Sequence, residues 1–321
     1  MVPARTLMRT ATLLAGVALL VACGRDAGPS AAERAARARA LADYQTAQAA
    51  WRAQRLAELT KPDGWTSLIG LERLEPGVHR VGSGADNGIR LRMGPPHLGL
   101  FTVQQGRVAF RADADVTLNG VPGRGGNVRS DADAGGPDVI GFDAGKGLAT
   151  VIRRGDTLLL RVRHADADSR LRFTGLQYWP GGRGWQVVAR FVPHPAGKTL
   201  PIGNIIGVVQ DIPNPGAVEF TRDGRAYRIE ALDEGEGGLF LVFADRTSGH
   251  GSYGAGRFLD AAKPDAKGRV LLDFNHAYNP PCAFTPFATC PLPPPENRLD
   301  LSVEAGEKAY AKPATTAKDA P

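Results

Sequence analysis

The sequence predicts an all-β protein: predominantly antiparallel strands in a sandwich or barrel-like arrangement of two β units, preceded by one N-terminal amphipathic helix. Short runs in which Leu, Val, Phe and Thr alternate with polar residues recur after residue 63, as in half-buried strands. Among them, strands are expected at Leu100–Val103, Arg107–Phe110 and Val116–Leu118. Turn-forming residues separate these runs, and the chain contains 40 glycines. Many short strands joined by tight turns are typical of an all-β domain.

The order of these features predicts how the chain is organised. We expect a lipoprotein signal peptide over 1–22, a tether over 23–39, a helix over 40–62, an N-terminal sandwich-like β unit over 63–192, a linker over 193–201, a C-terminal β unit over 202–306 with a Pro/Cys-rich segment over 273–298, and a disordered tail over 307–321.

The first residues have the pattern of an export signal, with Arg5 and Arg9 ahead of an apolar run. Leu20-Val21-Ala22-Cys23 resembles the bacterial lipoprotein box, which implies that Cys23 becomes the lipidated N-terminus. An uncleaved anchor helix is the alternative, but the apolar run is shorter than a bilayer span requires. Gly24 resembles the sorting pattern of outer-membrane lipoproteins. We therefore expect a lipid-anchored envelope protein at the outer membrane, facing the periplasm.

Charge and motifs exclude several classes of partner. The formal net charge is +6, and removal of Arg5 and Arg9 with the signal lowers it to +4. The basic residues form no stripe, so nucleic-acid binding is not expected. Gly249-x-Gly251-x-x-Gly254 has dinucleotide-binding spacing, but Pro264 and Gly268 interrupt the helix that must follow it. We expect no cofactor and no metal.

The predicted helix over 40–62 consists mainly of good helix formers. Its apolar residues Leu41, Tyr44, Ala47 and Trp51 step by three or four, and the helix can begin as early as Ala31. We expect it to pack Trp51 on the body of the protein. Binding of a partner by the apolar stripe is the alternative.

Part of the first β unit resembles the forkhead-associated domain, a phosphothreonine-reading β-sandwich. The resemblance lies in Val81-Gly82-x-x-x-Asp86-Asn87-x-Ile89-x-Leu91 and Val116-x-Leu118-Asn119-Gly120. It implies a sandwich. The family's phosphate-contacting arginine falls on Ser83, and Gly94-Pro95-Pro96-His97 replaces its second phosphate-binding stretch, so phosphopeptide recognition is not expected.

In the second β unit, the Asp223-Gly224 pair predicts a hairpin, and the apolar run Leu239–Phe243 predicts a buried strand. A last strand is expected over Leu299–Glu304. The segment from Asp273 to Arg298 contains seven prolines and two cysteines. Because proline removes backbone donors, this segment is expected to be extended and rigid and to lie over the sheet.

Cys282 and Cys290 admit three interpretations. The favoured one is a disulfide, since the chain is exported and Cys23 is used by lipid. The second is a metal site that combines both thiolates with Asp273 or His276. The third is a nucleophilic Cys282 with His276 as its base.

Polar residues gather at strand ends in this unit, and some of them are candidates for a functional site. The candidate acid–base groups are Asp245, Asp273 and His276. The candidate binding residues are Thr247, Tyr253, Arg257, Asn275, Tyr278, Asn279 and Asn297. The alternative is that the charged residues pair with Arg257 and the asparagines bond the irregular backbone.

A second resemblance covers most of the chain after the helix. Its motifs are Trp65 to Leu71, Phe240-x-x-Phe243-x-Asp245-x-Thr247, Tyr253-x-x-x-Arg257-Phe258-Leu259, Asp273-Phe274-Asn275-x-Ala277-Tyr278-Asn279-Pro280-Pro281-Cys282-Ala283-Phe284, Cys290-Pro291-Leu292-Pro293 and Glu296-Asn297-x-Leu299. These motifs resemble domain-of-unknown-function family 1684, a prokaryotic family. The resemblance implies no particular activity.

Three functions follow from these observations. The first is a non-catalytic binding or accessory module whose C-terminal unit has a polar cleft for a small molecule, glycan or peptide. The second is an envelope hydrolase that uses Asp245, Asp273 and His276. The third is a structural scaffold.

Overall fold

The computed structural model describes residues 30–235 and 237–311. The predicted signal peptide and Cys23 lie outside the described residues, as does the predicted tail from residue 312 onward. The chain divides into two compact units, Met1–Thr46 and Ala47–Pro321. All strands belong to the second unit. The predicted boundaries between β units stay predictions.

One long helix, α1, spans Ala31–Thr60. A reciprocal capping box starts it: the Ser30 amide donates to Glu33 Oε2 over 2.7 Å, and the Glu33 amide donates to Ser30 Oγ over 3.2 Å. The helix thus uses the early start that the sequence allowed, and residues 31–39 of the predicted tether are helical. Among the described residues, no helix has the length and apolarity needed to cross a membrane.

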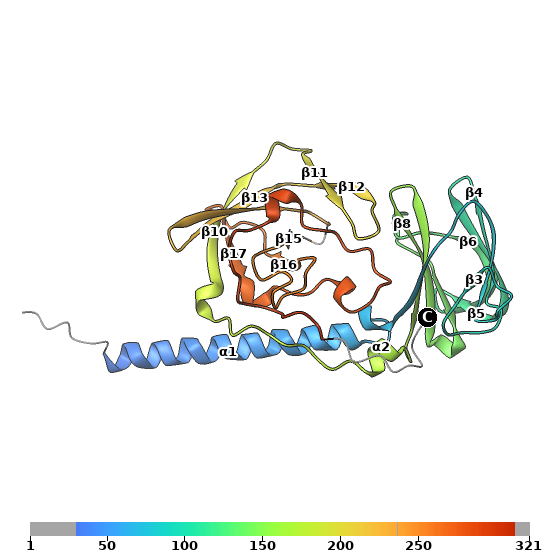
Figure 1. Ribbon diagram of the computed structural model, residues 1–321, viewed down its shortest axis with the longest axis horizontal. Helices are drawn as coiled ribbons and strands as arrows, with labels where there is room; N and C mark the ends of the chain where they lie inside the picture. Colours follow the sequence, from blue (N-terminus) through green and yellow to red (C-terminus); the bar gives the residue numbers. More distant parts are fainter. Residues whose placement is uncertain (1–29, 236, 312–321) are drawn as a thin grey trace, which may run out of the picture. The chain divides into compact units, whose positions relative to one another are not determined.

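The largest sheet has nine strands and curls into a nearly closed, barrel-like shape (Figure 1). Its strands are β1 (Leu68–Arg73), β2 (Gly77–Gly82), β3 (Ile89–Arg90), β4 (Gly99–Gln104), β5 (Arg107–Leu118), β6 (Val121–Val128), β7 (Val139–Phe142), β8 (Gly147–Arg154) and β9 (Thr157–His164). Their order is β1-β9-β8-β7-β5-β4-β2-β3, with β6 on β5. Only the β2–β3 pair is parallel among these described strands. The mostly β, barrel-like fold class is confirmed.

Alternating apolar residues make the core of this sheet. Phe101 and Phe110 lie opposite each other on β4 and β5, with ring centroids 4.7 Å apart. The β5–β6 turn is made by Asn119 and Gly120, both in the left-handed region with φ of 51° and 82°, as a tight hairpin requires. The runs expected at 107–110 and 116–118 form one strand, because a bulge between Arg111 and Val116 lets the pairing continue.

The remaining strands form smaller antiparallel sheets. These strands are β10 (Gln186–Pro193), β11 (Thr199–Gly203), β12 (Val209–Pro213), β13 (Gly216–Arg222), β14 (Arg225–Ala231), β15 (Leu239–Phe243), β16 (Arg257–Ala261) and β17 (Arg269–Asp273). One sheet has the order β14-β13-β10-β17, and the pairs β11–β12 and β15–β16 form the other two. The predicted hairpin at Asp223-Gly224 is confirmed. Strand β10 pairs with β13 and β17, although it precedes the predicted linker.

The connections are short helical turns. They are η1 (Trp65–Ser67), η2 (Asp143–Gly145), α2 (Asp168–Leu171), η3 (Arg183–Trp185), η4 (Phe274–His276), η5 (Pro281–Ala283) and η6 (Pro295–Asn297). Two expectations differ from the structure at the C-terminal end. Residues 299–304 form no strand. The predicted disordered tail began at 307, whereas Glu307 is fully buried and hydrogen-bonded.

Candidate functional site

A disulfide holds the proline-rich segment. Cys282 and Cys290 are bonded, with their Cα atoms 6.2 Å apart, and both are buried. They pack in a cluster with Val242 and Phe258 from strands β15 and β16. Of the three interpretations left open by the sequence, the structure has the disulfide. Sulfurs bonded to each other are available neither as a nucleophile nor as metal ligands.

Asp245 and Arg257 form an ion pair that is completely buried, with both side chains 0% exposed. Arg257 Nη2 donates to Asp245 Oδ2 over 2.6 Å and to the Val303 carbonyl over 2.9 Å, and Nη1 donates to the Ala305 carbonyl. Burial lowers the pKa of Arg257, while Asp245 opposes that change. The pair explains the irregular backbone at 299–305, because the guanidinium binds carbonyls there that have no strand partner.

Thr247 belongs to the same group. Its amide donates to Asp245 Oδ1 over 2.6 Å, and its hydroxyl lies 2.7 Å from Ser252 Oγ. Every oxygen of the Asp245 carboxylate thus has a donor within the protein. The arrangement is a buried structural network with no face toward solvent.

Asp273 is the centre of a second group. Its Oδ1 accepts from the amide of Asn275 over 3.0 Å and from the side chain of Asn275 over 2.7 Å. Its Oδ2 accepts from Gln48 Nε2 over 3.0 Å and from Gln186 Nε2 over 2.9 Å. His276 Nε2 lies 3.8 Å from Oδ2, beyond hydrogen-bond distance. Four donors therefore fix the Asp273 carboxylate.

Residues 47–60 of α1 supply the other side of this group. Trp51 stacks on His276 with ring centroids 4.5 Å apart, and the Arg52 guanidinium lies 4.2 Å from the Tyr178 ring centroid. The predicted packing of Trp51 on the body of the protein is confirmed. All four groups are half-buried.

Arg55 extends the contact by one helical turn. Its Nε lies 2.9 Å from Glu307 Oε1, and its Nη2 donates to the Asn279 carbonyl over 2.8 Å. Glu307 Oε2 accepts from the Asn279 amide over 2.8 Å. The guanidinium also lies 4.6 Å from the ring centroid of Tyr278. We use the term helix-docking cluster for the following residues: Gln48, Trp51, Arg52, Arg55, Tyr178, His276, Asn279 and Glu307.

Several buried polar atoms of the helix-docking cluster have no hydrogen-bond partner among residues 30–235 and 237–311. They are Gln48 Oε1, Arg52 Nε, Tyr178 OH, His276 Nε2 and Asn279 Oδ1. Burial lowers the pKa of His276, so its ring is neutral at neutral pH, and burial raises the pKa of Tyr178 to about 12. Burial also raises the pKa of Tyr278. The unpartnered atoms thus include a cationic donor, Arg52 Nε, and two acceptors, Gln48 Oε1 and Asn279 Oδ1.

The other two predicted binding residues lie elsewhere. Asn297 joins β14 to β15: its Oδ1 accepts from the Glu230 amide over 2.7 Å, and its Nδ2 donates to the carbonyls of Glu230 and Val242. Tyr253 is half-buried, and burial raises its pKa. Arg257 Nη1 also donates to the Glu307 carbonyl over 3.3 Å, so the Asp245–Arg257 pair and the helix-docking cluster meet at Glu307.

Sequence reasoning missed five members of the helix-docking cluster: Gln48, Arg52, Arg55, Tyr178 and Glu307. A signal existed for three of them, because Gln48, Arg52 and Arg55 follow the same three-to-four spacing as Trp51. Tyr178 and Glu307 lie in segments without regular structure, and their pairing in an isolated bridge has no sequence pattern. In the part of the chain that the structure describes, no group of three or more metal-ligating side chains gathers.

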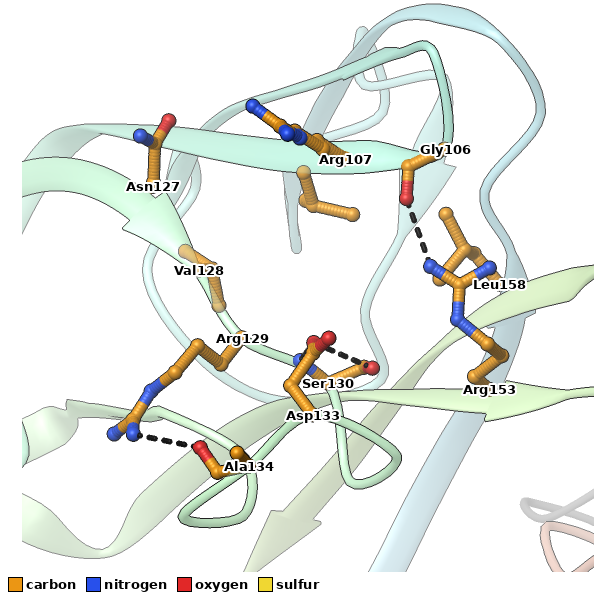
Figure 2. A pocket seen from close by; sticks show the side chains of 11 residues that line it. Gly106, Arg107, Asn127, Val128, Arg129, Ser130, Asp133, Ala134, Arg153 and Leu158 are labelled. Atoms are coloured by element: carbon orange, nitrogen blue, oxygen red, sulfur yellow. Dashed lines mark hydrogen bonds between the residues drawn. The ribbon is translucent and has the colours of Figure 1, made fainter.

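A pocket of about 430 Å³ lies outside both groups, on the nine-stranded sheet (Figure 2). Its lining includes Arg107, Arg153, Asn127 and Asp133. A second pocket of about 510 Å³, lined in part by Arg124 and Phe142, also lies on this sheet. Neither pocket is lined by residues that the sequence predicted as functional.

Comparison with known proteins places the chain in a family. Residues 171–308 match the family described as "Protein of unknown function (DUF1684)". Among solved structures, an uncharacterised protein of Haloarcula marismortui, determined by solution NMR, is 30% identical. That match has a TM-score of 0.36 and covers 43% of this chain and 78% of the archaeal one. The comparison with curated proteins gave no match. The chain belongs, through residues 171–308, to the DUF1684 family.

Proposed function

We propose that the protein is a lipid-anchored module of the outer membrane, facing the periplasm, that binds a polar ligand and performs no catalysis. The export signal with Cys23 supports the anchor and the location. The helix-docking cluster supports the binding role. The two parts of the proposal are independent, and separate experiments test them.

The observation that carries the binding role is a set of five buried polar atoms in the helix-docking cluster, which find no hydrogen-bond partner in the part of the chain that the structure describes. A buried polar atom without a hydrogen bond costs about 1 to 3 kcal/mol. A contact that leaves five such atoms is not optimised for stability alone. A ligand that displaces neighbouring side chains and supplies hydrogen-bond partners to these atoms removes part of that cost, which favours its binding.

The chemistry of the cluster indicates the class of ligand. The rings of Trp51, Tyr178 and His276 are half-buried and offer apolar surface with polar edges. Arg52 adds a cation at the same place. Aromatic surface with a few polar groups suits a glycan or a peptide, both of which have apolar faces and hydrogen-bonding edges.

The contacts of the three candidate acid–base residues weigh against the hydrolase. A general acid or base must reach a substrate proton. Asp245 is 0% exposed and paired with Arg257, and Asp273 accepts from four donors. His276 has its ring stacked on Trp51. These contacts support a binding role for the surface around His276 over acid–base catalysis.

Calorimetric titration of the full-length protein with muropeptides tests the binding role, because these compounds carry both glycan and peptide groups. We expect saturable binding, at least tenfold weakening by Trp51→Ala, and recovery of the muropeptide unchanged. Leu271→Ala, at a side chain 56% exposed on β17, is the matched control and should bind as the wild type does. Cleavage of the muropeptide favours the hydrolase. Binding that is indifferent to Trp51→Ala, or no binding, favours the scaffold.

Membrane fractionation tests the anchor. Mass spectrometry of the mature wild-type protein should find lipid on Cys23, with the protein in the outer-membrane fraction. Cys23→Ser should abolish the lipid and release the protein from the outer membrane. An unmodified Cys23 with an intact N-terminus would support the uncleaved anchor helix.

A further inference from the structure

The pocket on the nine-stranded sheet has a charge pattern that the proposed function does not use. Arg107 opens strand β5, and Arg153 lies near the end of β8. Asp133 comes from the loop after β6. Figure 2 shows Arg107 on the strand above the hollow, Arg153 at its right beside Gly106, and Asp133 and Ser130 at its lower side.

Arg107 is the most informative residue in this pocket. Its side chain makes no hydrogen bond and no ion pair with the rest of the described chain. All five N–H donors of its guanidinium are thus available to a ligand. A free surface arginine is common, so Arg107 by itself is not a site. Arg107 becomes a candidate site because it lines the same pocket as a second arginine, Arg153, whose position is fixed.

Arg153 is that second arginine. Its Nη2 donates to the Gly106 carbonyl over 2.8 Å, which holds the guanidinium beside the β4–β5 turn. Its other donors make no hydrogen bond to the residues of the described ranges. Because the side chain is already ordered, little rotamer entropy is lost when a ligand binds it.

Arg129 contributes differently. It pairs with Asp138, with Nη2 to Oδ1 over 2.8 Å, so its charge is balanced within the protein. Its Nη1 also donates to the Ala134 carbonyl. Arg129 therefore lines the pocket without adding net charge. The positive charge available to a ligand belongs to Arg107 and Arg153.

Asp133 gives the base of the pocket a fixed negative charge. Its Oδ2 accepts from the Ser130 amide over 2.6 Å and from the Ser130 hydroxyl over 2.8 Å. These bonds hold the pKa of Asp133 below its usual range. The carboxylate is therefore ionised and can accept from a hydroxyl group of a ligand.

From this arrangement we infer that the pocket binds a small hydroxylated organic anion. Arg107 and Arg153 take its carboxylate or phosphate group, and Asp133 accepts from its hydroxyl groups. Guanidinium groups suit both acids because they bind planar pairs of oxygens. A volume of about 430 Å³ is in the range of small-molecule sites.

Calorimetric titration of the full-length protein with D-glucuronate tests this site, with D-glucose as its neutral counterpart and inorganic phosphate as the second anion. We expect saturable glucuronate binding, weaker phosphate binding, and no glucose binding. Glucuronate affinity should fall at least tenfold in Arg107→Gln, since one charge-assisted interaction of this kind is worth a factor of ten or more. Arg107→Gln breaks no contact within the described chain, so its melting temperature should be that of the wild type.

Arg80→Gln is the matched control, because Arg80 is another exposed arginine of the same sheet, on β2, and is absent from the pocket lining. It should bind glucuronate as the wild type does. Equal weakening by Arg80→Gln, unchanged binding in Arg107→Gln, or no saturable binding of either anion would overturn the proposal. Phosphate binding as tight as glucuronate binding would show that Asp133 does not bind the hydroxyl groups of the ligand. Trp51→Ala should leave this site unaffected, which separates its test from that of the helix-docking cluster.

Discussion

The nine-stranded sheet and the segments from residue 171 onward are held together in different ways. The sheet is a nearly continuous ladder around an apolar core, in which residues such as Phe101, Ile140 and Leu160 are 0% exposed. The later segments form three small sheets, and buried side chains connect their irregular parts. In the first region a pattern of residues suffices to make the structure. In the second, single polar residues decide it.

Two buried arginines show this difference. Arg161, on β9, is 8% exposed and makes no ion pair with any other described residue; its guanidinium lies 5.4 Å from the Trp65 ring centroid. Burial lowers its pKa to about 10. Arg257 is more deeply buried but is paired with Asp245 and with three backbone carbonyls. Arg257 therefore holds separate segments together through its ion pair and hydrogen bonds, whereas Arg161 contributes mainly through packing.

The largest effect is expected from Arg257→Met. Removing one partner of a buried ion pair costs about 3 to 5 kcal/mol, because Asp245 is left as an unpaired buried charge. Arg161→Met is the matched control and should be neutral or stabilising, since no charged partner is left behind. Denaturant unfolding of both variants measures the difference. Similar costs for the two substitutions would remove the distinction between the regions.

A smaller effect is expected from reduction of the disulfide. Cys282 and Cys290 are eight residues apart, so in the loop-entropy account their bond contributes about 2 to 3 kcal/mol to the free energy of unfolding. Reductant should lower the melting temperature of the wild type. The double variant Cys282→Ala, Cys290→Ala should show no response to reductant. A wild type that melts equally with and without reductant would show that the proline-rich segment does not depend on the bond.

Arg55→Met tests the attachment of α1. It leaves the Glu307 carboxylate, 0% exposed, without its charged donor, and we expect a loss of about 1 to 3 kcal/mol in the free energy of unfolding. Lys61→Met breaks an ion pair that is half-exposed, between Lys61 and Glu58, and should cost under about 1 kcal/mol. Chemical denaturation followed by tryptophan fluorescence measures both variants. Equal losses would mean that the burial of Glu307 does not increase the contribution of the Arg55 ion pair to the free energy of unfolding.

The smallest effect is a dependence on pH. Burial lowers the pKa of His276 in the folded protein. The unfolded chain therefore binds a proton more readily, and folded stability decreases as the pH falls through the ordinary histidine pKa of about 6.5 toward the lower folded value. His276→Gln should lose less stability than the wild type between about pH 7.5 and about pH 5.5. An identical pH profile for the two proteins would contradict a half-buried His276 that is neutral in the folded protein.

The sequence predicted the fold class well because alternation and turns are local signals. The hairpin at Asp223-Gly224 and the strands near Phe101 and Phe110 follow from a few adjacent residues. The sheet membership of β10 did not, since pairing with β13 and β17 depends on contacts distant in sequence. The absence of a strand at 299–304 had the same cause, because the guanidinium that binds its carbonyls comes from residue 257.

The candidate site was predictable in composition only. The sequence named Asp273 and His276 but assigned no role to Gln48 or Arg55, which reach them and their neighbours across more than 220 positions. The sequence could not predict that Arg107 and Arg153 line one pocket, because they do so only when β5 and β8 join the same sheet. No local sequence pattern predicts contacts of this kind.

The buried polar residues of the later segments hold their irregular backbone in place. A double-mutant cycle on Asp245 and Arg257, using Asp245→Asn, Arg257→Met and the combined variant, tests this role most directly. We expect the two substitutions to couple by about 2 kcal/mol or more in the free energy of unfolding, because the pair is buried and each charge neutralises the other. A coupling near zero, with single variants as stable as the wild type, would contradict it and return Asp245 to the list of groups available for catalysis.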